Sequence, residues 1–207
     1  MGSPPLKAPH PLAYPSEPHV RRHGPQGYPK HRLYLNWLRD EFYFRCVYCL
    51  RRETWLTLRS DWQIDHFVPK SIHPGGTLDY DNLVYACANC NHSKAAYLAP
   101  DPCKVAYGRC VEVDDYGRIR ALDGDGVTLI EAIGLDDEDY IGLRVAVIDL
   151  LRELPEGGES YCRFFGFPKD LPDLSKERTP PGGNKRPDGI MQSCFEKARR
   201  SELPAYY

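Results

Sequence analysis

The residues Cys46-Val47-Tyr48-Cys49 are followed, later in the chain, by Cys87-Ala88-Asn89-Cys90. In each pair a short turn places two thiols within reach of one metal ion, so the two pairs together supply four ligands. Zinc binds thiolates in this way, with sulfurs at about 2.3 Å from the ion. Because four protein ligands leave no open coordination position, the pattern predicts a structural Zn²⁺ site. Four unrelated thiols or two redox pairs are the alternatives, and the paired spacing favours zinc.

The residues between and after the two cysteine pairs indicate short strands, a loop and a helix. Trp62-Gln63-Ile64-Asp65-His66 has the character of a short strand, as do residues 55–58 and 83–86. A loop with Gly75-Gly76 follows the strand that ends at His66, and Asn82 opens the next one. Residues 88–97 are expected to form a helix. The pattern therefore predicts two strands and a helix joined at the zinc site.

This ordered series, from Asp65-His66 through Asn82 to Asn91 and Lys94 after the last cysteine, resembles the HNH endonuclease family over residues 45–97. The resemblance implies a ββα-metal fold in which His66 is the general base and Asn82 fixes the loop that carries it. It also implies that Asp65 and Asn91 bind a catalytic Mg²⁺ or Mn²⁺ ion. Many members have histidine where this chain has Asn91, so the site is an HNN variant.

The chemistry of these side chains agrees with that resemblance. The imidazole of His66 titrates near neutral pH and is suited to accept a proton from water. Lys94 lies three residues after Asn91, on nearly the same helical face, and is expected to contact a substrate phosphate; a solvated surface lysine is the alternative. His73, in the loop, is a candidate for a substrate or metal contact, although a loop histidine is more often inert. The remaining cysteines are interpreted as packed or free thiols: Cys103, Cys110, Cys162 and Cys194.

Charge is distributed unevenly along the chain. The formal net charge of the 207 residues is only −2. Residues 1–60, however, contain ten Lys or Arg against four Asp or Glu, a net charge of +6. Residues 110–160 contain four against fourteen, a net charge of −10. This asymmetry predicts two faces with different partners.

The chain is long enough for one domain with appendages, and 42% hydrophobic residues suffice for a core. Residues 1–29, with eight prolines, are expected to be a basic arm that is flexible or lies along a phosphate backbone. Residues 30–100 are expected to form the nuclease domain, introduced by a helix over 30–44. Residues 101–167 are expected to form a hairpin near 111–122 and helices over 127–134 and 137–154. Residues 168–207 are expected to form a linker, to about 188, and a short helix over 189–201. The predicted fold class is α+β.

The paired cysteines and the Pro-rich start, with no apolar leader after Met1, predict a protein of the reducing cytoplasm. No apolar run approaches the roughly 20 residues of a membrane span.

Three functions remain open from the sequence. The first is a metal-dependent HNH endonuclease that cuts DNA as the effector of a prokaryotic antiphage system paired with an ATPase, as in Septu. The second is an HNH endonuclease that acts alone, as a restriction or mobile-element enzyme. The third is a zinc-stabilised binding module without catalysis, for nucleic acid or protein. The acidic residues 101–167 are expected to bind a protein partner, such as an ATPase subunit, or to form a homo-oligomer.

Overall fold

The computed structural model describes residues 10–55 and 61–207. Its centre is an antiparallel pair of strands, β1 (Trp62–His66) and β2 (Leu83–Cys87), followed directly by helix α2 (Ala88–Lys94). The register pairs Trp62 with Cys87 and His66 with Leu83. This unit is the expected ββα arrangement within an α+β fold. Of the expected strand over 55–58, residues 56–58 lie outside the described residues, and Trp55 lies in a turn.

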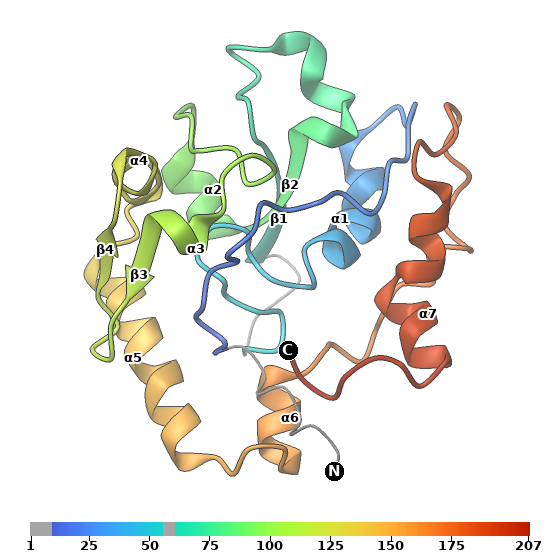
Figure 1. Ribbon diagram of the computed structural model, residues 1–207. Coiled ribbons are helices and arrows are strands. Elements are labelled where there is room, and N and C mark those ends of the chain that lie inside the picture. Colours follow the sequence, from blue (N-terminus) through green and yellow to red (C-terminus); the bar gives the residue numbers. More distant parts are fainter. Residues whose placement is uncertain (1–9, 56–60) are drawn as a thin grey trace.

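The two strands are joined by a long loop that projects above them in Figure 1. It contains two short 3-10 helices, η3 (Pro74–Leu78) and η4 (Tyr80–Asn82). Asp79 caps η4 by accepting a hydrogen bond from the Asp81 amide. The loop therefore has defined structure, and it returns the chain to β2 beside the end of β1.

The helix before the first cysteine pair is shorter than expected. A 3-10 turn, η1 (His31–Tyr34), leads into helix α1 (Leu35–Glu41). Tyr43 and Phe44 then adopt left-handed backbone conformations, with φ of 54° and 57°, which no helix continues through. The chain turns there into the first cysteine pair, and Trp37 and Leu38 of α1 are buried in the main core.

The N-terminal segment differs from the expected flexible arm wherever it is described, from residue 10 onward. The side chain of Glu41, fully buried at the end of α1, accepts hydrogen bonds from the backbone amides of Arg22 and His23 (2.8 and 2.9 Å). It also accepts one from the ring of His19 (2.9 Å). The basic residues expected to meet phosphate are thus partly committed inside the protein, because Arg22 also pairs with Asp40 at 3.1 Å.

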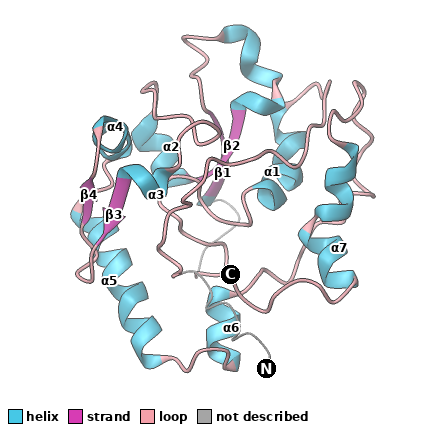
Figure 2. Cartoon of the chain, in the orientation of Figure 1, coloured by secondary structure: helices cyan, strands magenta, loops and turns pink. Residues whose placement is uncertain are grey.

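The acidic region packs on the zinc end of the ββα unit. A hairpin of β3 (Val111–Val113) and β4 (Ile119–Ala121) follows the short helix α3 (Tyr107–Cys110). Helices α4 (Gly124–Ile133), α5 (Glu138–Glu153) and α6 (Glu159–Phe165) complete the region. Figure 1 shows α5 and this hairpin on one side of the central strands, with α1 and α7 on the other. Figure 2 shows how few residues are in strands and how much of the chain is helix and loop.

The C-terminal part contains η5 (Pro187–Gln192) and α7 (Cys194–Arg199), separated at Ser193, where one helix was expected. The expected linker before it has no helix or strand but contacts the N-terminal segment, since Pro25 and Asn184 form an antiparallel bridge. Among the described helices, none combines the length and apolar character that crossing a bilayer requires.

Candidate active site

The four cysteines of the two pairs converge at one end of the ββα unit. Their sulfur atoms all lie within 4.8 Å of one another, and all four residues are buried. The sulfurs of Cys49 and Cys87 are 3.7 Å apart. Sulfurs at the corners of a tetrahedron with about 2.3 Å bonds to a central zinc are separated by about 3.8 Å. The donor type and spacing therefore fit a structural Zn²⁺ ion held by Cys46, Cys49, Cys87 and Cys90.

Helix α5 contributes a hydrogen bond to this site from outside the ββα unit. The hydroxyl of Tyr140 lies 3.2 Å from the sulfur of Cys90. Burial raises the pKa of Cys90, and hydrogen bonds from the other thiols, first from Cys46, lower the pKa of Cys87. Four thiolates within 4.8 Å of one another would repel, and a bound cation would offset that repulsion, which agrees with a metal at this position.

His66 ends β1 and is nine-tenths buried. Its Nε2 atom lies 3.0 Å from the carbonyl oxygen of Thr77, in the loop. Since a carbonyl only accepts, Nε2 carries the proton of the neutral ring, and Nδ1 keeps a free lone pair. Burial lowers the pKa of His66, and the charge of Lys70 adds to this effect, while the Thr77 hydrogen bond opposes it. The ring is consequently neutral near pH 7 and competent as a base at Nδ1.

Asn82 fastens the loop that holds His66. Its side-chain oxygen accepts the Val68 amide hydrogen at 2.8 Å, and its nitrogen donates to the carbonyls of Val68 (3.1 Å) and Gly76 (3.2 Å). Gly76 directly precedes Thr77, so the amide of Asn82 restrains the carbonyl that orients His66. A Cβ atom on Gly76 would lie 2.1 Å from the ring of His73, so a side chain there would have to displace that ring. His73 is exposed and packs on this glycine.

Asp65 and Lys94 form a buried pair behind the strand. The Lys94 ammonium is 3.2 Å from one carboxylate oxygen of Asp65 and 3.1 Å from the other, and it donates to the His66 carbonyl at 3.1 Å. Tyr48 donates to the same carboxylate at 2.6 Å. Burial raises the pKa of Tyr48, and Asp65 raises it further. Lys94 is completely buried, so its position differs from the expected contact with a substrate phosphate.

Asn91 lies in the middle of α2 and belongs to a separate hydrogen-bond network. Its side-chain nitrogen donates to Gln63 at 2.6 Å, near the surface, and its oxygen remains available. Asp65, by contrast, is already neutralised by Lys94. A divalent cation at Asp65 would lie beside this ammonium, and like charges repel. As placed here, Asp65 and Asn91 do not form an assembled cation site, and the expected Mg²⁺ or Mn²⁺ at these residues stays a prediction.

Four residues at these sites were not expected from the sequence. Tyr48 lies between the two ligands of the first cysteine pair, and Tyr140 follows an acidic run. Thr77 acts through its backbone carbonyl, for which residue type carries no signal. His31, in η1, contacts the ring of His66, with centroids 5.5 Å apart. Only the helical pattern ahead of Cys46 pointed to that part of the chain.

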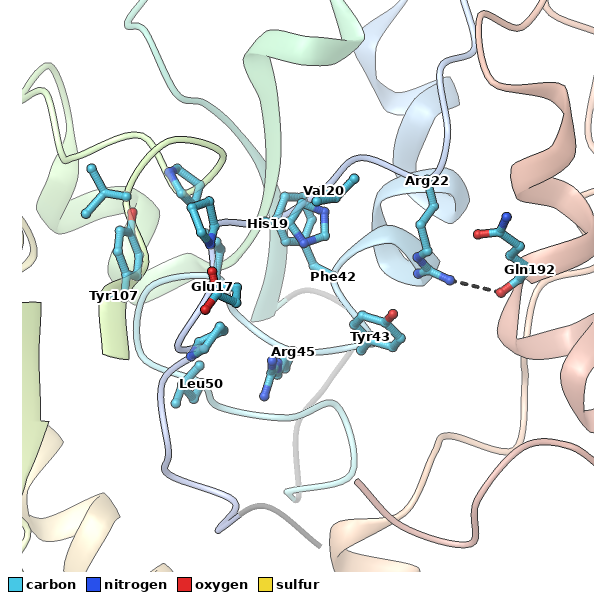
Figure 3. Close-up of a pocket in the computed structure, with 15 residues that line it drawn as sticks. Glu17, His19, Val20, Arg22, Phe42, Tyr43, Arg45, Leu50, Tyr107 and Gln192 are labelled. Carbon is cyan, nitrogen blue, oxygen red and sulfur yellow. Dashed lines mark hydrogen bonds between the residues drawn. The ribbon is translucent and has the colours of Figure 1, made fainter. Parts of the chain in front are cut away.

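A cavity of about 450 Å³ lies apart from these residues (Figure 3). It is bounded by the N-terminal segment, the end of α1 and the first cysteine pair, with Phe42, Tyr43 and Tyr107 among its walls. Arg22 closes one side by donating to the Gln192 carbonyl at 3.1 Å. None of the expected site residues lines it, so its location alone does not connect it with the chemistry at His66.

Comparison with known proteins places these observations in a family. No curated protein is significantly similar in sequence to this chain. Residues 46–96 match the family model described as HNH endonuclease. The matched residues begin at Cys46 and include β1, β2, α2, His66 and Asn82. This part of the chain is therefore an HNH endonuclease domain, with a four-cysteine cluster suited to zinc.

Proposed function

We propose that the protein is an endonuclease that hydrolyses phosphodiester bonds in DNA, with His66 as the general base. The hydrogen bond between His66 Nε2 and the Thr77 carbonyl supports this role most directly, because it leaves Nδ1 as the basic atom. The HNH domain supports the reaction class.

In the proposed reaction, a water molecule hydrogen-bonded to Nδ1 of His66 attacks the phosphorus atom. Its proton passes to Nδ1 as the new phosphorus–oxygen bond forms, and the departing sugar oxygen takes the electrons of the broken bond and a proton from solvent water. Asn82 and Thr77 are positioning residues in this scheme, since they fix the ring through the loop. The Lys94–Asp65 pair positions the backbone of His66 from behind. No step is assigned to a cation, because Asp65 and Asn91 are not assembled around one.

The test is nicking of supercoiled plasmid by the zinc-loaded full chain, with Mg²⁺ or Mn²⁺ added. Wild type is expected to convert the plasmid to open circles, and His66→Ala is expected to lose at least 100-fold in rate, the lower range for a general base. Zinc content and thermal unfolding should be the same in both proteins. Equal cutting by wild type and variant would falsify the catalytic assignment, and the absence of cutting by wild type would favour the binding-module alternative.

We also infer a protein partner for the acidic region. Within it, residues 110–160 carry a net charge of −10, which opposes a DNA backbone. Tyr116, Leu122 and Val127 are exposed to 75%, 48% and 45% on the hairpin and α4. Apolar groups within an acidic face suit a protein surface better than water or phosphate. The antiphage role with an ATPase subunit is the specific form of this proposal. Co-purification of an ATPase with the native protein supports it, whereas a chain that stays monomeric and cuts one sequence alone overturns it.

A further inference from the structure

A groove beside His66 is built largely by residues that precede the HNH domain. It has a volume of about 480 Å³ and is lined by Pro29, Lys30, His31, Arg32, Thr77 and Leu78. We name it the η1 groove. Its two walls are held together by a hydrogen bond of 3.0 Å from the Tyr34 hydroxyl to the Leu78 carbonyl. Tyr34 ends η1 and is fully buried, so this hydrogen bond ties η1 to the loop from inside the protein.

The cations of this groove differ from the neighbouring arginines in having no acidic partner. Arg22 and Arg39 pair with Asp40 and Glu53, at 3.1 and 2.7 Å. Lys30 and Arg32 are exposed, and across residues 10–55 and 61–207 neither takes part in an ion pair or side-chain hydrogen bond. Their positive charge is therefore available to a ligand.

The acidic residues that follow Leu78 do not neutralise the groove. Asp79 caps η4 by accepting the backbone hydrogen of Asp81, and its single negative charge is outnumbered by the positive charges of Lys30 and Arg32. Asp81 is itself paired with Arg186 at 3.0 Å. The groove consequently presents net positive charge to an approaching molecule.

The η1 groove leads directly to His66. Thr77, which lines the groove, accepts the hydrogen bond of His66, and the ring of His31 meets that of His66 edge to face at 68°. Lys70 is exposed, and its charge lowers the pKa of both His31 and His66, although burial is the larger cause in each case. A chain of phosphates that lay in this groove would pass the proposed base.

We propose that the η1 groove binds the sugar–phosphate backbone of the DNA strand that His66 cleaves, with Lys30 and Arg32 on successive phosphates. The inference rests on the proposed nuclease function. It assigns substrate binding to a segment outside the family match, so the residues before Cys46 complete the site. His31 bounds the path between these cations and His66.

The experiment measures binding of a fluorescein-labelled random-sequence DNA duplex to the zinc-loaded full chain by anisotropy, over 50 to 300 mM NaCl and without divalent cations. Each phosphate contact contributes about 0.9 to the slope of log K against log salt. The double variant Lys30→Ala/Arg32→Ala should therefore lower the slope by about 2 and weaken binding about 60-fold at 0.1 M salt. Neither side chain has a partner in the part of the chain that the structure describes, so folding is expected to be unchanged, which zinc content and thermal unfolding verify.

The matched control is Arg120→Ala/Arg152→Ala, which removes the same charge from the acidic region. These two arginines are 71% and 59% exposed and pair only with exposed carboxylates. The control should retain the wild-type slope. A double groove variant with the slope of wild type overturns the proposal, as does a control that loses as much as the groove variant.

The outcome also separates this proposal from the nuclease assignment. If DNA binding depends on the groove but the wild-type chain cuts no DNA, the groove proposal stands and the nuclease assignment is wrong. If the wild type cuts DNA but the groove variant binds as tightly as wild type, the nuclease assignment stands and the groove proposal is wrong. Groove-dependent binding that is tighter for an RNA duplex of the same sequence would overturn the choice of DNA.

Discussion

Asn82 offers the sharpest test of how the loop controls His66. The substitution Asn82→Ala removes three hydrogen bonds, to Val68 N–H, the Val68 carbonyl and the Gly76 carbonyl. At about 1 kcal/mol of net stabilisation each, we expect a loss of about 3 kcal/mol in the free energy of unfolding. Because Gly76 precedes Thr77, the carbonyl that orients His66 should also become mobile. A misplaced base of this kind costs about 100-fold in kcat, with little change in KM.

Asn82→Asp provides the matched comparison, because it has the same shape. One carboxylate oxygen keeps the Val68 amide hydrogen, but the other replaces a donor that lies 3.1 and 3.2 Å from two carbonyl oxygens. Oxygen facing oxygen in a site that is only 8% exposed raises the pKa of the new carboxyl. The ionised form should therefore destabilise more than alanine at pH 8.

The sign of the pH effect follows from that raised pKa. The folded state of Asn82→Asp then binds the carboxyl proton more tightly than the unfolded state. The stability of this variant is therefore retained at low pH and is lost as pH rises from about 3.9, the pKa in the unfolded state, to the higher pKa in the folded state. Urea unfolding at pH 5 and pH 8, for wild type and both variants, measures the difference. If Asn82→Asp is as stable as wild type at pH 8, the three-bond account of Asn82 is wrong.

Three further predictions concern the zinc site and the buried ion pairs. Replacing Cys87 and Cys90 together by Ser should abolish zinc binding, measured by elemental analysis, and unfold the ββα unit, since metal supplies much of the folding energy of such motifs. Lys94→Met should cost about 3–5 kcal/mol, because it strands the Asp65 carboxylate in the interior, and Asp65→Asn in the same chain should recover part of that loss in urea unfolding. If Lys94 contacted only the substrate and did not pair with Asp65, Asp65→Asn would recover no stability. Glu41→Ala should release the N-terminal segment, seen as faster hydrogen exchange at residues 22–23; unchanged protection there would contradict the role of Glu41 as its anchor.

The local pattern was sufficient for the central unit. The strand that ends at His66 and the helix after Cys87 depend on contacts between residues close in sequence. The two cysteine pairs are far apart in sequence, but their spacing indicates that they share one metal ion. The observed β1, β2 and α2 agree with those expectations within a few residues. The helix before Cys46 was placed correctly but extended too far, because left-handed conformations at Tyr43 and Phe44 are decided by the packing of the turn.

Long-range contacts decided the rest. Composition alone made the Pro-rich segment look flexible, yet a buried carboxylate on α1, 18 residues beyond His23, holds it in place. Likewise, the spacing of Asn91 and Lys94 placed both on one helical face. Only the position of that face over β1 decides that Asn91 hydrogen-bonds to Gln63 and Lys94 to Asp65. The sequence by itself predicted the four cysteines as zinc ligands, because paired thiols at this spacing carry that chemistry, and its resemblance to HNH endonucleases pointed to His66 as the candidate base. The tertiary structure decided which carbonyl orients His66, which cations remain free beside it and which are paired, because those depend on partners far away in the chain.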